Sequence, residues 1–88
     1  MAKVLIVTGG SRGLGAATCI GAAEQGYDAI CVNYVSNNSR ADEVVAPSEK
    51  AGAKAIAVQA DISLEGDVVR LFETVDKELG TVTHLVNS

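Results

Sequence analysis

The chain has 88 residues, enough for one small domain, and 48% of them are hydrophobic against 20% charged, as is typical of a globular protein. Its net charge of −4 and its singly scattered basic residues argue against a nucleic-acid partner, because proteins that bind nucleic acids carry a basic face. No apolar run approaches the roughly 20 residues that span a membrane, and no secretory leader is recognisable, so we expect a cytoplasmic protein that does not enter a membrane.

Four short apolar runs alternate with three longer segments of helical character. We expect strands at residues 4–7, 29–32, 54–59 and 82–86. Helices are expected at 13–25 and 40–50, each followed by a glycine that can end it. Pro47 lies inside the second helix and should kink or split it, with a bend near Val45. Ser63 is the expected N-cap of a third helix, whose apolar residues recur every three to four positions until Gly80 ends it.

This alternation predicts an α/β fold. A helix between consecutive strands makes the strands parallel and the crossovers right-handed. The doubly wound, Rossmann-type arrangement places the strands in the spatial order 3-2-1-4, with a ligand crevice at the carboxyl ends of strands one and four, where the order reverses. Residues 1–88 are in this interpretation the N-terminal βαβαβαβ part of a single dinucleotide-binding domain.

The segment between the first strand and the first helix carries the strongest functional signal. It reads Thr8-Gly9-Gly10-Ser11-Arg12-Gly13-Leu14-Gly15 and has the context of a phosphate-binding turn. Gly9 lets the chain leave the strand sharply, Gly13 lets the main chain approach a pyrophosphate, and Gly15 lets the helix pack closely on the sheet. The helix N-terminus offers free N–H groups and a partial positive charge to the anion. A structural turn is the alternative, while a P-loop would need Lys followed by Ser or Thr.

The pattern T-G-x-x-x-G-x-G resembles that of the classical short-chain dehydrogenase/reductase family and covers the first third of it. Three further matches fall after the later strands: Val32-Asn33-Tyr34, Ala60-Asp61-Ile62 and Leu85-Val86-Asn87. The branch that looks most similar is that of the bacterial ketoacyl-carrier-protein reductases and glucose dehydrogenases. The resemblance implies an oxidoreductase that transfers hydride between a nicotinamide cofactor and a small carbonyl or alcohol substrate, in a homo-oligomer.

The residues near the second strand bear on the choice of cofactor. A carboxylate there would bind the adenosine ribose and repel a 2′-phosphate, and the chain has neutral Asn33 instead. Arg12 offers a planar set of donors suited to phosphate; the alternative role is a solvated loop charge. In the family this combination resembles NADP-preferring members, with Tyr34 lining the adenosine end. We therefore expect NADP(H) rather than NAD(H).

The remaining candidate residues follow the third and fourth strands. The resemblance implies that Asp61 accepts from the adenine amine and that Ile62 flanks the ring; the alternative for Asp61 is a helix cap. Asn87 resembles the first Asn of the family's N-N-A-G motif, which stabilises the fourth strand beside the cofactor, but Ser88 departs from the second. The single histidine, His84, is placed in the middle of the fourth strand and is expected to be structural.

Neither catalysis nor metal binding is expected of these residues. The family's catalytic Ser and its Y-x-x-x-K pair are absent, since neither Tyr27 nor Tyr34 has a Lys four places on. Two cysteines lie in apolar segments without metal-ligand spacing, and we expect them to be reduced and buried. The chain is then either part of an NADP-dependent short-chain oxidoreductase or a non-catalytic nucleotide-binding or interaction module. Because the fourth strand would form an open sheet edge, we expect the 88-residue polypeptide alone to associate through it, to aggregate or to be loosely ordered.

Overall fold

The computed structural model describes residues 2–11, 13–36 and 38–87. Strands and helices alternate along this part of the chain, as the sequence predicts. Their bounds are β1 (Val4–Thr8), α1 (Gly13–Glu24), β2 (Ala29–Tyr34), α2 (Asn38–Lys50), β3 (Lys54–Gln59), α3 (Glu65–Glu78) and β4 (His84–Asn87).

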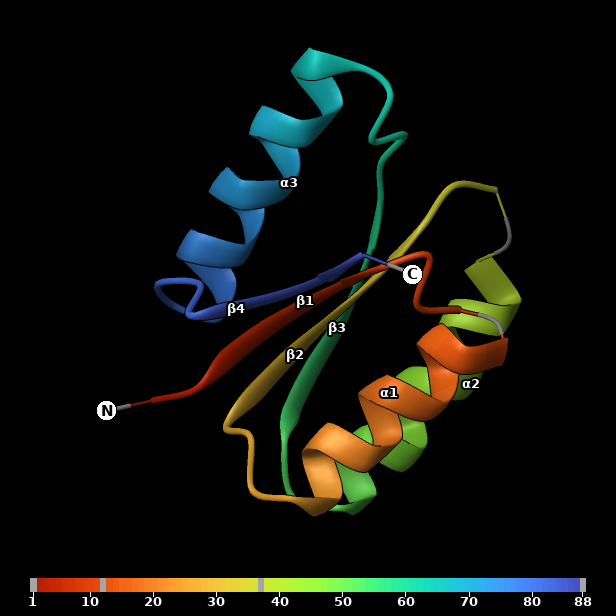
Figure 1. Ribbon diagram of the computed structural model, residues 1–88, viewed down its shortest axis with the longest axis vertical. Helices are drawn as coiled ribbons and strands as arrows, with labels where there is room; N and C mark the ends of the chain where they lie inside the picture. Colours follow the sequence, from red (N-terminus) through yellow and green to blue (C-terminus); the bar gives the residue numbers. More distant parts are fainter. Residues whose placement is uncertain (1, 12, 37, 88) are drawn as a thin grey trace.

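The strands form one parallel sheet in the order β3-β2-β1-β4, which confirms the predicted fold class and strand order. Helices α1 and α2 cover one face of the sheet and α3 covers the other (Figure 1). The sheet order reverses between β1 and β4, so the crevice expected of a doubly wound fold lies at the carboxyl ends of these strands.

The two central strands, β1 and β2, are buried on both faces of the sheet, because successive side chains of a strand point to opposite sides. In β1, Leu5 and Val7 belong to the hydrophobic cluster under α1 and α2, whereas Val4 and Ile6 belong to the cluster under α3. The two cysteines divide in the same way: Cys19 lies in the first cluster and Cys31 in the second. Both thiols are free and buried, as expected, and burial raises the pKa of each to about 12.

Helix α2 continues through Pro47, so the proline does not split the helix, which was one of the two predicted effects. The proline removes one main-chain hydrogen bond, at a cost of about 3 kcal/mol in an isolated helix. Packing offsets this cost: Ala41, Val44 and Ser48 are buried, and the Ser48 hydroxyl donates to the carbonyl oxygen of Val44 at 2.9 Å. The fold therefore holds the helix together where its local sequence would divide it.

The fourth strand begins two residues later than predicted, at His84. Its ladder is preceded by Thr83, whose side-chain oxygen accepts from the N–H of Val4 at 2.9 Å in place of a main-chain carbonyl. His84 is therefore the first residue of the strand rather than a central one, and it is exposed. Its ring and that of Tyr27 form an edge-to-face pair with 5.3 Å between the ring centroids, at the end of the sheet opposite the predicted crevice. None of the helices in the described residues is long and apolar enough to cross a membrane.

Candidate functional site

The parallel sheet brings the predicted site residues to one edge. Thr8 ends β1 beside Asn87 of β4, and Asn33 near the end of β2 lies beside Val58 of β3. The turn into α1, the end of β2 and the loop after β3 therefore adjoin the same crevice. Parallel strands joined by helices place every carboxyl end at the same edge, which is the physical reason for this convergence.

The glycine turn leaves β1 at Gly9, which has a positive φ of 65° as its predicted role requires. The next residue, Gly10, is the most tightly packed of the turn. A Cβ atom there would lie 2.9 Å from the carbonyl oxygen of Val7 and 3.1 Å from the sulfur of Cys19. The Gly10 N–H also donates to the main-chain oxygen of Asn33 at 2.9 Å. Close packing between the turn, α1 and β2 thus depends on Gly10, a role that the sequence analysis gave only to Gly15.

Helix α1 starts at Gly13, whose backbone has a positive φ of 51°. Apart from its chain neighbours and its own helix backbone, a Cβ on Gly13 would meet no atom of the described residues within 4 Å, so this side of the turn is open. Gly15 is buried on the helix, whereas the Leu14 side chain is 85% exposed and Ser11 is half-buried. The predicted phosphate-binding residue Arg12 lies outside the described residues.

The side chain of Asn33 occupies a different place from the one expected. It is only 1% exposed, and its Nδ2 donates to the carbonyl oxygens of Val58 and Ala60 at 3.2 and 3.1 Å. Its Oδ1 accepts from the N–H of Gly9 at 3.3 Å. Asn33 therefore connects the glycine turn to β3 from inside the sheet and does not present its amide to a ribose. The prediction that it faces the cofactor is wrong, because alternation along β2 turns it toward the buried α3 face.

Tyr34 follows on the opposite face of β2. Its side chain is half-buried and packs against the hydrophobic cluster under α1 and α2. It is the last residue of the strand. This is the end of β2 at which an adenosine ribose binds in doubly wound folds.

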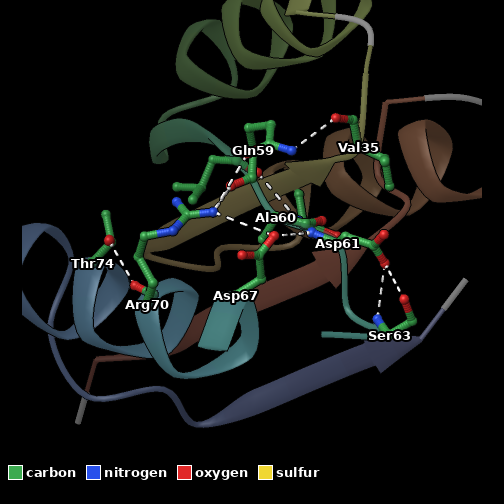
Figure 2. Close-up of polar contacts among 10 residues, drawn as sticks. Val35, Gln59, Ala60, Asp61, Ser63, Asp67, Arg70 and Thr74 are labelled. Atoms are coloured by element: carbon green, nitrogen blue, oxygen red, sulfur yellow. Dashed lines mark hydrogen bonds and ion pairs between the residues drawn. The ribbon is translucent and has the colours of Figure 1, made fainter. Parts of the chain in front are cut away.

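Asp61 lies in the loop between β3 and α3 and is held by a short turn (Figure 2). Its Oδ1 accepts from the Ser63 hydroxyl at 2.6 Å and from the Ser63 N–H at 3.0 Å. These bonds favour the ionised carboxyl group and lower the pKa of Asp61 below its usual range. The Ser63 side chain therefore bonds to Asp61, and the prediction that Ser63 is the N-cap of α3 is wrong. The N-cap is Leu64, which supplies no side-chain bond, so the alternative role of Asp61 as a helix cap is not realised either.

Two predicted residues border a small apolar cavity of about 130 Å³. Ile62, 44% exposed, forms one wall, and Asn87 forms another. The Oδ1 of Asn87 accepts a hydrogen bond from the hydroxyl of Thr8 at 2.7 Å, which connects the ends of β1 and β4. This agrees with the role in stabilising β4 that the resemblance implies. Ser88, the position that departs from the motif, lies outside the described residues.

Three residues at this edge had no predicted role of their own: Gly10, Thr8 and Asp67. Gly10 and Thr8 belong to the recognised glycine motif, so their positions in that motif could have indicated their roles. Asp67 could not, because its Oδ2 accepts from the N–H of Asp61, six residues earlier and outside any standard capping pattern, at 2.8 Å. No group of side chains in the described residues could hold a metal ion.

Three curated relatives match nearly the whole chain. The oxidoreductase YgfF of Escherichia coli is 44% identical over 85 residues, which cover 97% of this chain and 34% of that protein. The short-chain dehydrogenase/reductase homolog YusS of Bacillus subtilis is 40% identical over 98% of this chain and 78% of its own length. The 3-oxoacyl-[acyl-carrier-protein] reductase FabG of Staphylococcus epidermidis is 34% identical over the full chain and 36% of that enzyme. The chain thus spans about a third of two of these relatives and most of the third.

The fold comparison agrees with the sequence comparison. A crystal structure from Burkholderia cenocepacia, solved with bound NADP, superposes with a TM-score of 0.94 at 30% identity and covers 98% of this chain and 33% of that one. Residues 3–88 match the short chain dehydrogenase family. With a parallel sheet in the order β3-β2-β1-β4 and a glycine turn after β1, this chain belongs to the short-chain dehydrogenase/reductase family.

Proposed function

We propose that this chain forms the adenosine and pyrophosphate half of an NADP(H) site in a short-chain oxidoreductase. The observation that carries the proposal is the glycine turn. Gly13 opens α1 with its main chain uncovered, directly beside the point where the strand order reverses. A helix N-terminus in this position supplies free N–H groups and a partial positive charge to a pyrophosphate.

The adenosine part would lie between the ends of β2 and β3. Asp61 has one carboxylate oxygen held by Ser63, and this fixes the direction of the other, which accepts no hydrogen bond within the described residues. That oxygen is available to the exocyclic amine of adenine, and the exposed Ile62 is available to flank the ring. Tyr34 completes this side of the site from the end of β2.

The preference for NADP(H) is supported by charge. No acidic residue occurs between positions 33 and 36, so nothing at the end of β2 repels a 2′-phosphate. Because Asn33 is buried, Tyr34 and the residues after it, rather than Asn33, would lie nearest the 2′-phosphate. Arg12 in the turn would add the planar donors that bind phosphate. The similar Burkholderia structure holds NADP, which is consistent with the same preference.

When bound, the nicotinamide of such a cofactor supplies hydride to a carbonyl carbon or takes it from an alcohol. The residues of this chain would bind and orient the cofactor for that reaction. The proton transfer to substrate requires the family's Ser, Tyr and Lys, which are not in this sequence. The substrate class proposed is therefore a small carbonyl or alcohol compound, and the complete enzyme is proposed to be a homo-oligomer.

A non-catalytic nucleotide-binding module is the second candidate. It is favoured by one observation, the coverage of 78% of the length of YusS, which shows that a relative little longer than this chain occurs. The two candidates share the cofactor site and differ in turnover. A protein that binds NADPH but oxidises it with no carbonyl compound, although it folds cooperatively, would support the module.

Calorimetric titration of the natural-length protein with NADPH and NADH tests the cofactor site. Gly13→Ala places a methyl group at the open side of the turn and is expected to weaken binding of both cofactors at least tenfold, the change that about 1.4 kcal/mol produces. Gly26→Ala is the matched control, because Gly26 also has a positive φ and an open Cβ position but lies at the far end of α1. Equal losses in the two variants would show that backbone strain, and not the site, is responsible.

Arg12→Ala tests the choice of cofactor separately. It is expected to weaken NADPH binding much more than NADH binding, because only NADPH carries the 2′-phosphate that the guanidinium would contact. Equal losses for the two cofactors would overturn the assignment to NADP(H) while leaving the dinucleotide site in place.

A further inference from the structure

The polar contacts around the start of α3 form a connected chain that ends at Asp61. Arg70 on the second turn of the helix donates to the carbonyl oxygen of Gln59 at 2.7 Å and lies 3.7 Å from the carboxylate of Asp67. Asp67 in turn accepts from the N–H of Asp61 at 2.8 Å. Figure 2 shows these side chains between the end of β3 and the first turns of α3.

The position of Asp67 on the helix makes this contact unusual. With Leu64 as N-cap, Asp67 is the third residue of α3. An acidic side chain at that position ordinarily turns back to the N–H of the N-cap residue itself. Here the Leu64 N–H donates to the carbonyl oxygen of Asp61 at 2.9 Å instead, and Asp67 reaches three residues further back. The helix end therefore holds the loop rather than its own cap.

The consequence is that both ends of Asp61 are fixed. Its main-chain N–H is bound by Asp67, and its Oδ1 is bound by Ser63. The Asp67 side chain is only 28% exposed, so this bond is partly shielded from water, whereas the carboxylate of Asp61 faces solvent. With its main chain and one carboxylate oxygen both held, Asp61 keeps the second oxygen in one direction, so little conformational entropy is lost when a ligand binds there.

We propose that Asp67 is a positioning residue for adenine recognition, acting through the main chain of Asp61 and supported by Arg70. The inference rests on the proposed cofactor site, in which Asp61 accepts from the adenine amine. Asp67 itself touches no ligand. Its contribution is to hold the loop so that the free oxygen of Asp61 meets the amine without rearrangement.

The test compares NADPH with its hypoxanthine analogue, in which an oxygen replaces the adenine amine. The natural-length protein is expected to bind NADPH about tenfold more tightly than the analogue, as one hydrogen bond to a partly solvated charged group would give. Asp67→Leu is expected to reduce this ratio to nearly one. Asp67→Asn keeps an acceptor oxygen and is expected to restore most of the ratio. Asp76→Ala, an exposed aspartate on the same helix, should leave the ratio unchanged.

The ratio separates positioning from a general effect on folding, which would weaken both ligands equally. If Asp67→Leu binds both ligands less tightly but keeps the natural ratio, Asp67 is only structural and the inference fails, while the proposed cofactor site stands. If the natural protein does not distinguish the two ligands, the Asp61–adenine contact of the proposed function fails, and the inference with it. Retention of the natural ratio by Asp67→Leu at unchanged affinity would also overturn the inference.

Discussion

Replacing Gly10 by alanine should destabilise the protein by steric conflict at the glycine turn. The added methyl carbon would lie 2.9 Å from the carbonyl oxygen of Val7, 3.1 Å from the sulfur of Cys19 and 3.3 Å from Cγ1 of Val32. The first of these atoms is main chain within a buried strand, and Cys19 and Val32 are fully buried. None can move aside freely, so we expect the cost of overpacking a core, about 1–3 kcal/mol in the free energy of unfolding.

Urea denaturation followed by far-ultraviolet circular dichroism measures this change. Gly66→Ala is the matched control, since it adds the same methyl group to a glycine of α3 where no atom lies within 4 Å. Alanine is the better helix former, so this control should stabilise the protein by up to about 1 kcal/mol. The two variants should therefore differ in sign. A Gly10→Ala protein as stable as the natural one would refute the packing argument for this turn.

Four further outcomes are expected. Asn33→Ala should cost about 2 kcal/mol or more in unfolding free energy, because it leaves the N–H of Gly9 and the carbonyls of Val58 and Ala60 without their partner. Ser63→Ala should raise the pKa of Asp61 toward its usual value, as carbon-13 titration of the carboxyl group would show. Cys19 and Cys31 should react with a thiol reagent at mildly alkaline pH only after denaturation, since burial raises the pKa of each to about 12. The 88-residue polypeptide alone should elute as an associated species on size exclusion, because β4 is an edge strand in which Leu85 is 54% exposed.

Each of these has a result that would count against it. An Asn33→Ala variant no less stable than an exposed substitution such as Gln59→Ala would mean that the buried amide contributes nothing net. An unchanged Asp61 titration would exclude the Ser63 hydroxyl as the main cause of the lowered pKa. The lowered pKa also fixes how Asp61 affects stability as the pH changes. The folded state favours the ionised carboxyl group, so Asp61 stabilises the fold above its unfolded-state pKa, and this contribution is lost as the pH falls through its folded-state pKa. Rapid labelling of native thiols, or a monodisperse monomer with a sharp melting transition, would contradict the last two.

Most of the fold could be predicted because it depends on local patterns. Short apolar runs alternating with helical segments favour parallel strands with right-handed crossovers, and the Rossmann-type form of that arrangement has the strand order that the structure shows. The bounds of the strand Lys54–Gln59 were predicted to the residue, because the local apolar run marks them. The boundaries that differ are those set by tertiary contacts. Thr83 replaces a main-chain partner and delays β4, while burial of Ala41, Val44 and Ser48 keeps α2 continuous through Pro47.

The glycine turn and the family it indicates were determined by the sequence alone, because backbone freedom at Gly9 and Gly13 is a property of residues without a Cβ. Tertiary structure decided which side chains face the crevice. Asn33 and Tyr34 are neighbours in sequence, yet alternation along β2 buries the first against β3 and places the second against the cluster under α1 and α2. Likewise, the hydrogen bond between the Asp61 N–H and the Asp67 carboxylate forms only where the loop after β3 turns back onto the start of α3. Which face of the sheet a side chain occupies, and which distant groups it contacts, are decided only when the sheet and its helices are assembled.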